Sequence, residues 1–387
     1  MKINNTKDVG LHYIKKLGIK PERSAQKIFD KLSQEFGAIE ADAYMDSLYD
    51  MTDKNKKLFY KLKNSDYQKS MIFSGAYDAD IIRKACNWIE CHKECFGETI
   101  LEVGCDCGFM TPFLATSFPN ARIVAVDRND KAIDIARRNL KKFEVNNVEF
   151  FTGDIKLLKG KKFETVFSMR TVQENRKRRY IEHFHDDWKI TSDEFMQVIN
   201  DYAMLLDTLT AENGTLVSIE RMEVDPLFLA WLKSLNRNGF RTDVEDIEQL
   251  HVYELDDTHD FPAIIAKRGE PVSDHELEQK WLEMLGYNPD KKQWKNWEAL
   301  AAANDLSDKL IEGSYVLNEE NECVGKMAYF SVKDDPDSLL FLINAGTEKD
   351  CTLQLLPKDE ESTIREELLR ILEHNRNLGF TIKKINE

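Results

Sequence analysis

Between about residues 98 and 268, short apolar runs alternate with segments that repeat apolar residues at helical spacing. The runs TILEVG, RIVAVD and VEFFTGD each predict a buried strand. Because parallel strands need a crossover between them, usually a helix, this order predicts successive β-α units and an α/β fold with a doubly wound, mostly parallel sheet. Two further strands, near 247–254 and in FPAIIAKR, complete an expected set of seven.

Different patterns flank this region. In SAQKIFDKLSQEFG, Ser24 can cap a helix, one apolar stripe runs along it, and Gly37 can end it. After the polar, proline-containing segment 268–276, a helical stretch leads into alternating strands, a helix and a closing strand, which predicts a small α+β domain. The expected division is a helical cap over 1–96, the sheet domain over 97–268, a helical linker region over 269–309 and the α+β domain over 310–387.

Charge and cysteine usage narrow the class of protein. The net charge of −15 argues against broad binding to nucleic acid or to anionic membranes, because both need a positive field. No apolar run approaches the ~20 residues that span a bilayer, and the start of the chain lacks a secretory signal, so we expect a cytoplasmic protein with reduced thiols. Cys86, Cys91, His92 and Cys95 lie close together, but no C-x-x-C pair occurs and no metal site is expected.

The turn after the first expected strand, within LEVGCDCGFM, contains Gly104, Asp106 and Gly108. This turn lies at the carboxyl edge of the sheet, beside the point where the strand order reverses and ligands bind. Glycine there can take positive φ and let a ligand lie against the backbone. A dinucleotide fingerprint would carry a third glycine, and Asp106 would repel a pyrophosphate but attract a ligand with a cation and an amino group.

The same stretch resembles the first motif of the class I S-adenosylmethionine-dependent methyltransferases, E/D-x-G-x-G-x-G. Glu102, Gly104, Asp106 and Gly108 match it, with the middle glycine replaced by the aspartate. The resemblance covers about 98–268 and implies S-adenosylmethionine as cofactor. It also implies a seven-stranded Rossmann-like methyltransferase sheet that ends in an antiparallel hairpin.

The resemblance implies roles for residues at later strand ends. Asp127 would hold the two ribose hydroxyls, and Asp154 would accept from the adenine amino group with Ile155 beside the ring. Cys105 and Arg128, next to the motif acids, and Tyr77, whose ring could face the sulfonium, complete the expected cofactor contacts. Asp127 and Asp154 could instead be helix caps or loop acids, and Tyr77 could equally be a core tyrosine.

The segment after the fourth strand, SMRTVQENRKRRYIEHFHDDW, would lie on the acceptor side. It lacks the Asn/Asp-Pro-Pro-Tyr signature with which family members methylate amino groups of nucleobases or of glutamine, so base methylation is not expected. Glu174, His183 and His185 are the titratable candidates for a catalytic base, although a polar loop explains them equally well. The basic run 176–179 could steer an acidic substrate or simply be solvated.

The expected function is methyl transfer from S-adenosylmethionine to a small molecule or a protein side chain. One alternative is a protein that binds S-adenosylmethionine as a regulator or scaffold without transferase activity. Another is an oxidoreductase with a nicotinamide cofactor, which the missing third glycine and Asp106 disfavour. The α+β domain could bind a partner, mediate dimerisation into a homo-oligomer, or support the core.

Overall fold

The computed structural model describes residues 8–49, 53–175, 188–222, 225–243, 247–255, 257–319, 321, 323–345 and 350–385. The chain divides into two compact units. The first comprises Met1–Arg176, Asn200–Glu223 and Ser234–Val272, and the second comprises Lys177–Ile199, Val224–Lys233 and Ser273–Glu387. Among the described residues, no helix has both the length and the apolar character needed to cross a bilayer.

The first unit begins with helices, as the sequence predicts. They are α1 (Val9–Leu17), α2 (Ala25–Phe36), α3 (Ala38–Tyr49), α4 (Asp53–Lys63), α5 (Tyr67–Tyr77) and α6 (Ala79–Cys91), followed by the 3-10 turn η1 (Lys93–Cys95). The Ser24 hydroxyl accepts from the Lys27 amide at 3.4 Å, and Gly37 ends α2 with a φ of 92°. Both predicted boundaries of this helix are therefore correct.

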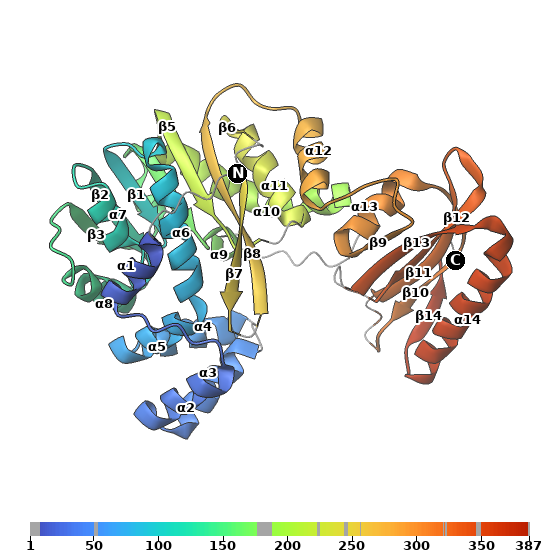
Figure 1. Cartoon of the computed structure of the whole chain (residues 1–387), viewed down its shortest axis with the longest axis horizontal. Coiled ribbons are helices and arrows are strands. Elements are labelled where there is room, and N and C mark those ends of the chain that lie inside the picture. Colours follow the sequence, from blue (N-terminus) through green and yellow to red (C-terminus); the bar gives the residue numbers. More distant parts are fainter. Residues whose placement is uncertain are drawn as a thin grey trace. The chain divides into compact units, whose positions relative to one another are not determined.

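A sheet of eight strands follows. The strands are β1 (Thr99–Val103), β2 (Arg122–Asp127), β3 (Val148–Thr152), β4 (Phe163–Met169), β5 (Thr210–Ile219), β6 (Phe240–Thr242), β7 (Glu248–Glu254) and β8 (Asp257–Arg268). Their order is β3-β2-β1-β4-β5-β8-β6, with β7 also paired to β8. The first five strands are parallel, and β8 is antiparallel to its neighbours (Figure 1).

The expected number of strands in this sheet, seven, is one too few. The additional strand is β6, whose three residues pair with the end of β8 from Phe240 opposite Arg268 to Thr242 opposite Ala266. A strand of three residues shows a single alternation between buried and exposed positions, so its sequence carries no periodic signal.

Helices connect the strands of this sheet along the chain. They are α7 (Thr111–Ser117), α8 (Asp130–Leu140), the 3-10 turn η2 (Ile155–Leu158), α9 (Val172–Asn175), α10 (Trp188–Leu209) and α11 (Pro226–Arg237). One core cluster joins α1, α6, α7 and α8 to the sheet. A separate cluster joins the four helices α2, α3, α4 and α5, and contains Ile28, Tyr44, Phe59 and Phe73. The predicted helical cap therefore has two parts, one packed on the sheet and one with a core of its own (Figure 1).

The second unit contains a six-stranded antiparallel sheet in the order β14-β10-β11-β12-β13-β9. Its elements are α12 (Asp274–Met284), β9 (Gln293–Lys295), α13 (Asn296–Leu306), β10 (Ser307–Leu317), β11 (Cys323–Val332), β12 (Asp335–Asn344), β13 (Cys351–Pro357), the 3-10 turn η5 (Lys358–Glu360), α14 (Glu361–Asn377) and β14 (Thr381–Lys384).

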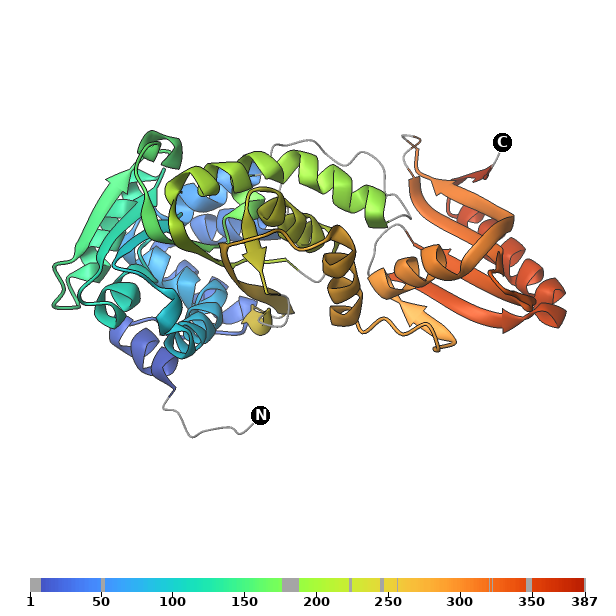
Figure 2. The same ribbon diagram turned by 90° about the horizontal axis from the view of Figure 1, so that it is seen from above.

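Helices cover both faces of this second sheet (Figure 2). Leu340 and Leu342 of β12 pack with α13, whereas Leu339 and Phe341 of the same strand pack with α14, as the alternation of side chains along a strand requires. The range 269–309 supplies β9 and α13 to this sheet and its core, where the sequence predicts a helical linker region.

Candidate active site

The carboxyl ends of β1 and β4 are neighbours in the first sheet, and the strand order reverses between them. In open α/β sheets, ligands bind at this position because the loops after the two strands turn to opposite sides and leave a crevice. The turn after β1 contains the predicted residues Gly104 to Gly108, and the turn after β4 begins at Arg170.

Gly104 and Gly108 both have a φ of 67°, which side chains disfavour. A Cβ on Gly104 would stand 2.8 Å from the Thr171 Cγ2, and one on Gly108 would stand 2.6 Å from the Ala136 Cβ. The two glycines are thus required by close packing against the turn after β4 and against α8. The sequence predicts that their conformational freedom serves a ligand, and it does not indicate these two protein contacts.

Cys105 lies between the two motif acids but faces inward. Its side chain is buried against Ala125 and Ile133, and its amide donates to the Val126 carbonyl at 3.0 Å. The structure therefore places the Cys105 thiol in the core beneath the turn, away from the carboxyl edge where the other candidate residues gather.

Asp106 is a non-glycine residue with a φ of 45°. Its carboxylate is paired with the Lys63 ammonium and accepts from the Asn64 Nδ2 at 3.3 Å. Although burial would raise the pKa of Asp106, the Lys63 charge and these hydrogen bonds hold it below its ordinary value. Lys63 also lies 3.5 Å from an Asp78 carboxylate oxygen, so a buried ammonium joins two acids.

Asp127, at the end of β2, accepts a hydrogen bond from the glycine turn after β1. Its Oδ2 accepts from the Asp106 amide at 2.9 Å, and its Oδ1 accepts from the Asn129 amide at 2.8 Å. Burial and the nearby Asp106 charge raise the pKa of Asp127. An ionised carboxylate has about four acceptor positions, so two remain for further donors.

Asp154 and Arg128 form an ion pair across the ends of β2 and β3. Their closest atoms are 3.3 Å apart, and the Arg128 guanidinium also donates to the Asn175 Oδ1 at 2.7 Å. Asp154 caps η2 by accepting from the Lys156 amide at 2.9 Å, while the side chain of Ile155 is buried. The structure thus brings Arg128 and Asp154, at the second and third strand ends, into contact.

Glu102 points into the interior of the sheet domain. It is 3% exposed, and no described residue hydrogen-bonds to its Oε2. Burial, with a contribution from the Asp127 charge, raises its pKa to about 8. A buried acid of this kind is held partly protonated at neutral pH, and such groups concentrate at functional sites.

Arg170, at the end of β4, is a site residue that sequence reasoning missed. It has a φ of 58°, which lies in the left-handed region. Two non-glycine residues in this region, Asp106 and Arg170, therefore lie one on each side of the switch point. Its guanidinium pairs with Asp78 at 2.7 Å and with the buried Glu254 at 3.1 Å. Nothing in the sequence marks Arg170 except its position after an apolar strand.

Glu220 is a second residue that the sequence reasoning missed. It is 2% exposed and accepts from the amides of Thr171 at 2.6 Å and Val172 at 3.0 Å. Glu220 thus fixes the turn after β4, against which Gly104 packs. Burial raises its pKa, against the effect of these hydrogen bonds.

The remaining candidates differ in how the structure places them. Tyr77 packs in the α2–α5 core, with its ring centroid 6.2 Å from that of Phe59. Glu174 lies on α9 and accepts from the Tyr60 hydroxyl at 3.4 Å. His183, His185 and the basic run 176–179 lie outside the described residues. Within the described ranges, no group of three or more His, Cys, Asp or Glu residues could hold a metal ion.

Comparisons with known proteins agree with this arrangement. A family model described as "Methyltransferase domain" matches residues 96–223, and one described as "Protein-L-isoaspartate(D-aspartate) O-methyltransferase (PCMT)" matches residues 23–159. A release factor glutamine methyltransferase of Buchnera aphidicola is 28% identical over 133 residues, which cover 32% of this chain and 46% of that protein. A malonyl-[acyl-carrier protein] O-methyltransferase of Priestia megaterium is 36% identical over 75 residues, which cover 19% and 26%.

Among solved structures, a SAM-dependent methyltransferase from Aquifex aeolicus aligns with 46% of this chain and 88% of its own, at 16% identity and a TM-score of 0.32. The chain spans less than half the length of the curated relatives named above. The family matches nevertheless fall on the sheet that carries the glycine turn and the acids at successive strand ends. The family matches therefore support the assignment of this domain to the class I S-adenosylmethionine-dependent methyltransferase superfamily.

Proposed function

We propose that this protein transfers a methyl group from S-adenosylmethionine to a small molecule or to a protein side chain. The observation that carries the proposal is the convergence of Asp106, Asp127 and Asp154 at the carboxyl ends of three adjacent parallel strands. This convergence lies beside a glycine turn in a domain that matches methyltransferase families.

The chemistry of these side chains fits the proposed cofactor. S-adenosylmethionine presents donors, namely an ammonium, two ribose hydroxyls and an adenine amino group, and carboxylates only accept when ionised. Asp127 keeps two acceptor positions beyond its backbone bonds, and the buried Ile155 offers an apolar surface to a ring. A pyrophosphate would instead meet Asp106 as a like charge, which disfavours a nicotinamide dinucleotide.

In the proposed reaction, the acceptor atom forms a bond to the methyl carbon while the bond from that carbon to sulfur breaks and leaves its electron pair on sulfur. Bound S-adenosylmethionine supplies the reactive methyl group and a neutral leaving group. The protein therefore has to hold the two reactants in line and exclude water, which can contribute ~7–11 kcal/mol. Asp127 would orient the donor at its sugar, and α4 and α5 would cover the carboxyl edge.

The acceptor side is built from α4 and α9. Tyr60 of α4 donates to Glu174 of α9 at 3.4 Å, and Glu174 is the proposed proton acceptor among the described residues. His183 and His185 stay proposals for the same role. An acceptor that is already ionised, such as the carboxylate implied by the name of the malonyl-[acyl-carrier protein] relative, would need no base.

The cytoplasm is the proposed location of the protein.

The proposal is tested by incubating the protein with donor labelled on the methyl group and with fractionated extract. We expect label on a product that survives removal of the donor, and an Asp127→Asn variant that binds S-adenosylmethionine at least tenfold more weakly, about 1.4 kcal/mol. Asp130→Asn is the matched control, because Asp130 is an exposed acid three residues further along. Donor binding without any labelled product would leave the regulatory role instead, and absence of donor binding would remove the proposal.

A further inference from the structure

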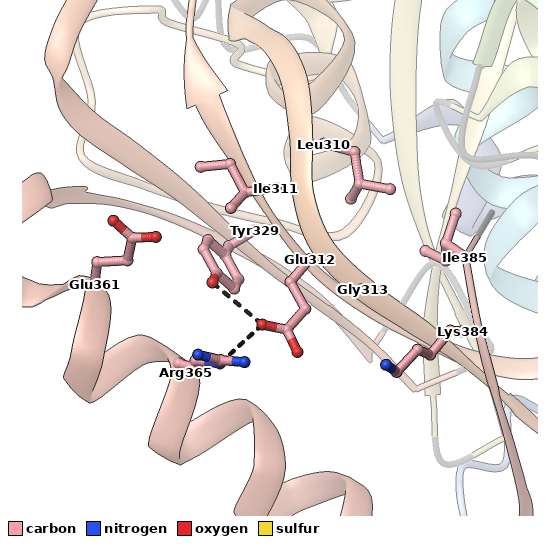
Figure 3. Close-up of a pocket in the computed structure, with 9 residues that line it drawn as sticks. All are labelled: Leu310, Ile311, Glu312, Gly313, Tyr329, Glu361, Arg365, Lys384 and Ile385. Carbon is pink, nitrogen blue, oxygen red and sulfur yellow. Dashed lines mark hydrogen bonds and ion pairs between the residues drawn. The ribbon is translucent and has the colours of Figure 1, made fainter. Parts of the chain in front are cut away.

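The second unit contains a surface hollow of about 480 Å³. It lies between β10, β14 and α14, far along the chain from the methyltransferase domain, and the proposed function makes no use of it. Its lining residues are Leu310, Ile311, Glu312, Gly313, Tyr329, Glu361, Arg365, Lys384 and Ile385 (Figure 3). Ligand sites in proteins are typically of this volume and combine apolar surface with a few converging polar groups.

An irregularity in β10 shapes this hollow. The pairing with β11 shifts between Leu310, which lies opposite Phe330, and Glu312, which lies opposite Tyr329, so Ile311 is an extra residue on one strand. Such a bulge redirects side chains and is frequent beside functional sites. Gly313 follows, where a Cβ would stand 2.7 Å from the Ala328 Cβ and 2.9 Å from the Ile385 Cδ1, so this glycine leaves room for Ile385, the residue after β14, to line the hollow.

Three polar residues that line the hollow contact one another. The Glu312 Oε2 pairs with the Arg365 Nε at 3.0 Å and accepts from the Tyr329 hydroxyl at 3.4 Å (Figure 3). Tyr329 is 2% exposed, and burial together with the Glu312 and Glu361 charges raises its pKa. Among the described residues, Glu312 and Arg365 have no ion-pair partner besides each other, so their remaining oxygen and terminal nitrogens can bind a ligand.

Two further residues of opposite charge, Glu361 and Lys384, line the hollow. Glu361 and Lys384 form no ion pair with any residue in the described part of the chain. Figure 3 shows them on opposite sides of the Glu312–Arg365 pair. The hollow thus offers two acceptor groups, Glu361 and Glu312, and two donor groups, Arg365 and Lys384.

We propose that this hollow binds a free amino acid with an aliphatic side chain. The ligand's ammonium would bind Glu361 and Glu312, and its carboxylate would bind Lys384 and Arg365. Its side chain would lie on Leu310, Ile311 and Ile385, of which Ile311 is 42% exposed without a ligand. A simple anion would face two carboxylates and a simple cation would face two basic groups, so a ligand with both charges matches the hollow best.

The test is calorimetric titration of the full-length protein with L-leucine, L-isoleucine and L-valine up to about 10 mM. N-acetyl-L-leucine, which lacks the ammonium, and L-leucinamide, which lacks the carboxylate, are the matched probes. We expect at least one free amino acid to bind and both blocked forms of leucine to bind at least fivefold more weakly than leucine.

Variants locate the binding. Glu361→Gln and Lys384→Met should each weaken it at least fivefold, whereas Glu366→Gln on the same helix and Lys383→Met on the opposite face of β14 should not. S-adenosylhomocysteine should bind all four variants equally, which separates this hollow from the donor site. The proposal is overturned if no free amino acid binds, if blocked leucines bind as well as leucine, or if the lining variants behave like their controls.

Discussion

Gly108 and Gly160 share a left-handed backbone but differ in their surroundings. Gly108 has a φ of 67° and packs on Ala136. Gly160 has a φ of 93°, and a Cβ added there would have no described atom within 4 Å and would enter open space. Comparing the two separates the cost of backbone strain from the cost of lost packing space.

Gly108→Ala should therefore lower the free energy of unfolding by at least ~2 kcal/mol more than Gly160→Ala does. The Gly160 variant should lose only the ~1–2 kcal/mol that an alanine pays in a left-handed conformation. Urea unfolding of both variants measures the difference. Equal losses would mean that the turn moves away from α8 without cost.

Glu102 provides a prediction about pH at the same scale. Its ordinary pKa of 4.5 is raised to about 8 in the folded protein, so between these values the folded state binds more protons than the unfolded state. Stability should therefore fall as the pH rises through this window, by about 5 kcal/mol at most, and level off above it.

Glu102→Gln should remove that slope, because glutamine does not titrate. Urea unfolding of both proteins at several pH values between about 5 and 9 gives the comparison. The new amide also changes the free energy of unfolding by an amount that does not depend on pH. This change does not affect the test, because only the pH dependence is compared. A variant whose stability falls with pH as steeply as the unmodified protein would contradict the assignment to Glu102.

Helix α4 connects to the sheet domain through its last residue, Lys63, and the adjoining Asn64. Lys63 pairs with Asp106 of the glycine turn and Asp78 of the α5–α6 junction, and Asp78 pairs with Arg170 after β4. The ion pairs thus tie α4 and the turns after β1 and β4 together. This network fixes two left-handed residues, Asp106 and Arg170, at the switch point.

Lys63→Met should lower the free energy of unfolding by ~3–5 kcal/mol, because it leaves the partly buried Asp106 carboxylate without its cation and Asp78 with Arg170 alone. Lys61→Met, an exposed position on the same helix, should change it by less than ~0.5 kcal/mol. Adding Asp106→Asn to Lys63→Met should recover part of the loss, because it removes one uncompensated charge. The double-mutant cycle fails this prediction if the two substitutions add independently.

At the scale of the whole molecule, the chain contains two compact units with separate cores. A ligand that binds one folded unit stabilises only that unit, by about 2.7 kcal/mol at a hundred times its dissociation constant. Calorimetry with S-adenosylhomocysteine should therefore move one unfolding transition upward and leave another in place. A single transition that moves as a whole would show that the units unfold together.

Much of this fold could be predicted because its signals are local. The apolar runs of β1 and β2, the cap at Ser24 and the stop at Gly37 depend on neighbouring residues, and all four predictions are correct. β6 was missed because three residues show no period. Asp127 ends β2, and Asp154 caps η2. Their position at one edge of the sheet could be predicted because parallel strands align their carboxyl ends.

The sequence by itself determined the parallel sheet, the position of its glycine turn and the acids around it, because each follows from the order of short apolar runs and turns. Only the tertiary structure decided which charges meet there. Lys63 and Asp106 are 43 residues apart in the chain, and Asp78 and Arg170 are 92 apart. Such pairs form because folding brings distant elements together and buried charges require partners, and no pattern within one element records that choice.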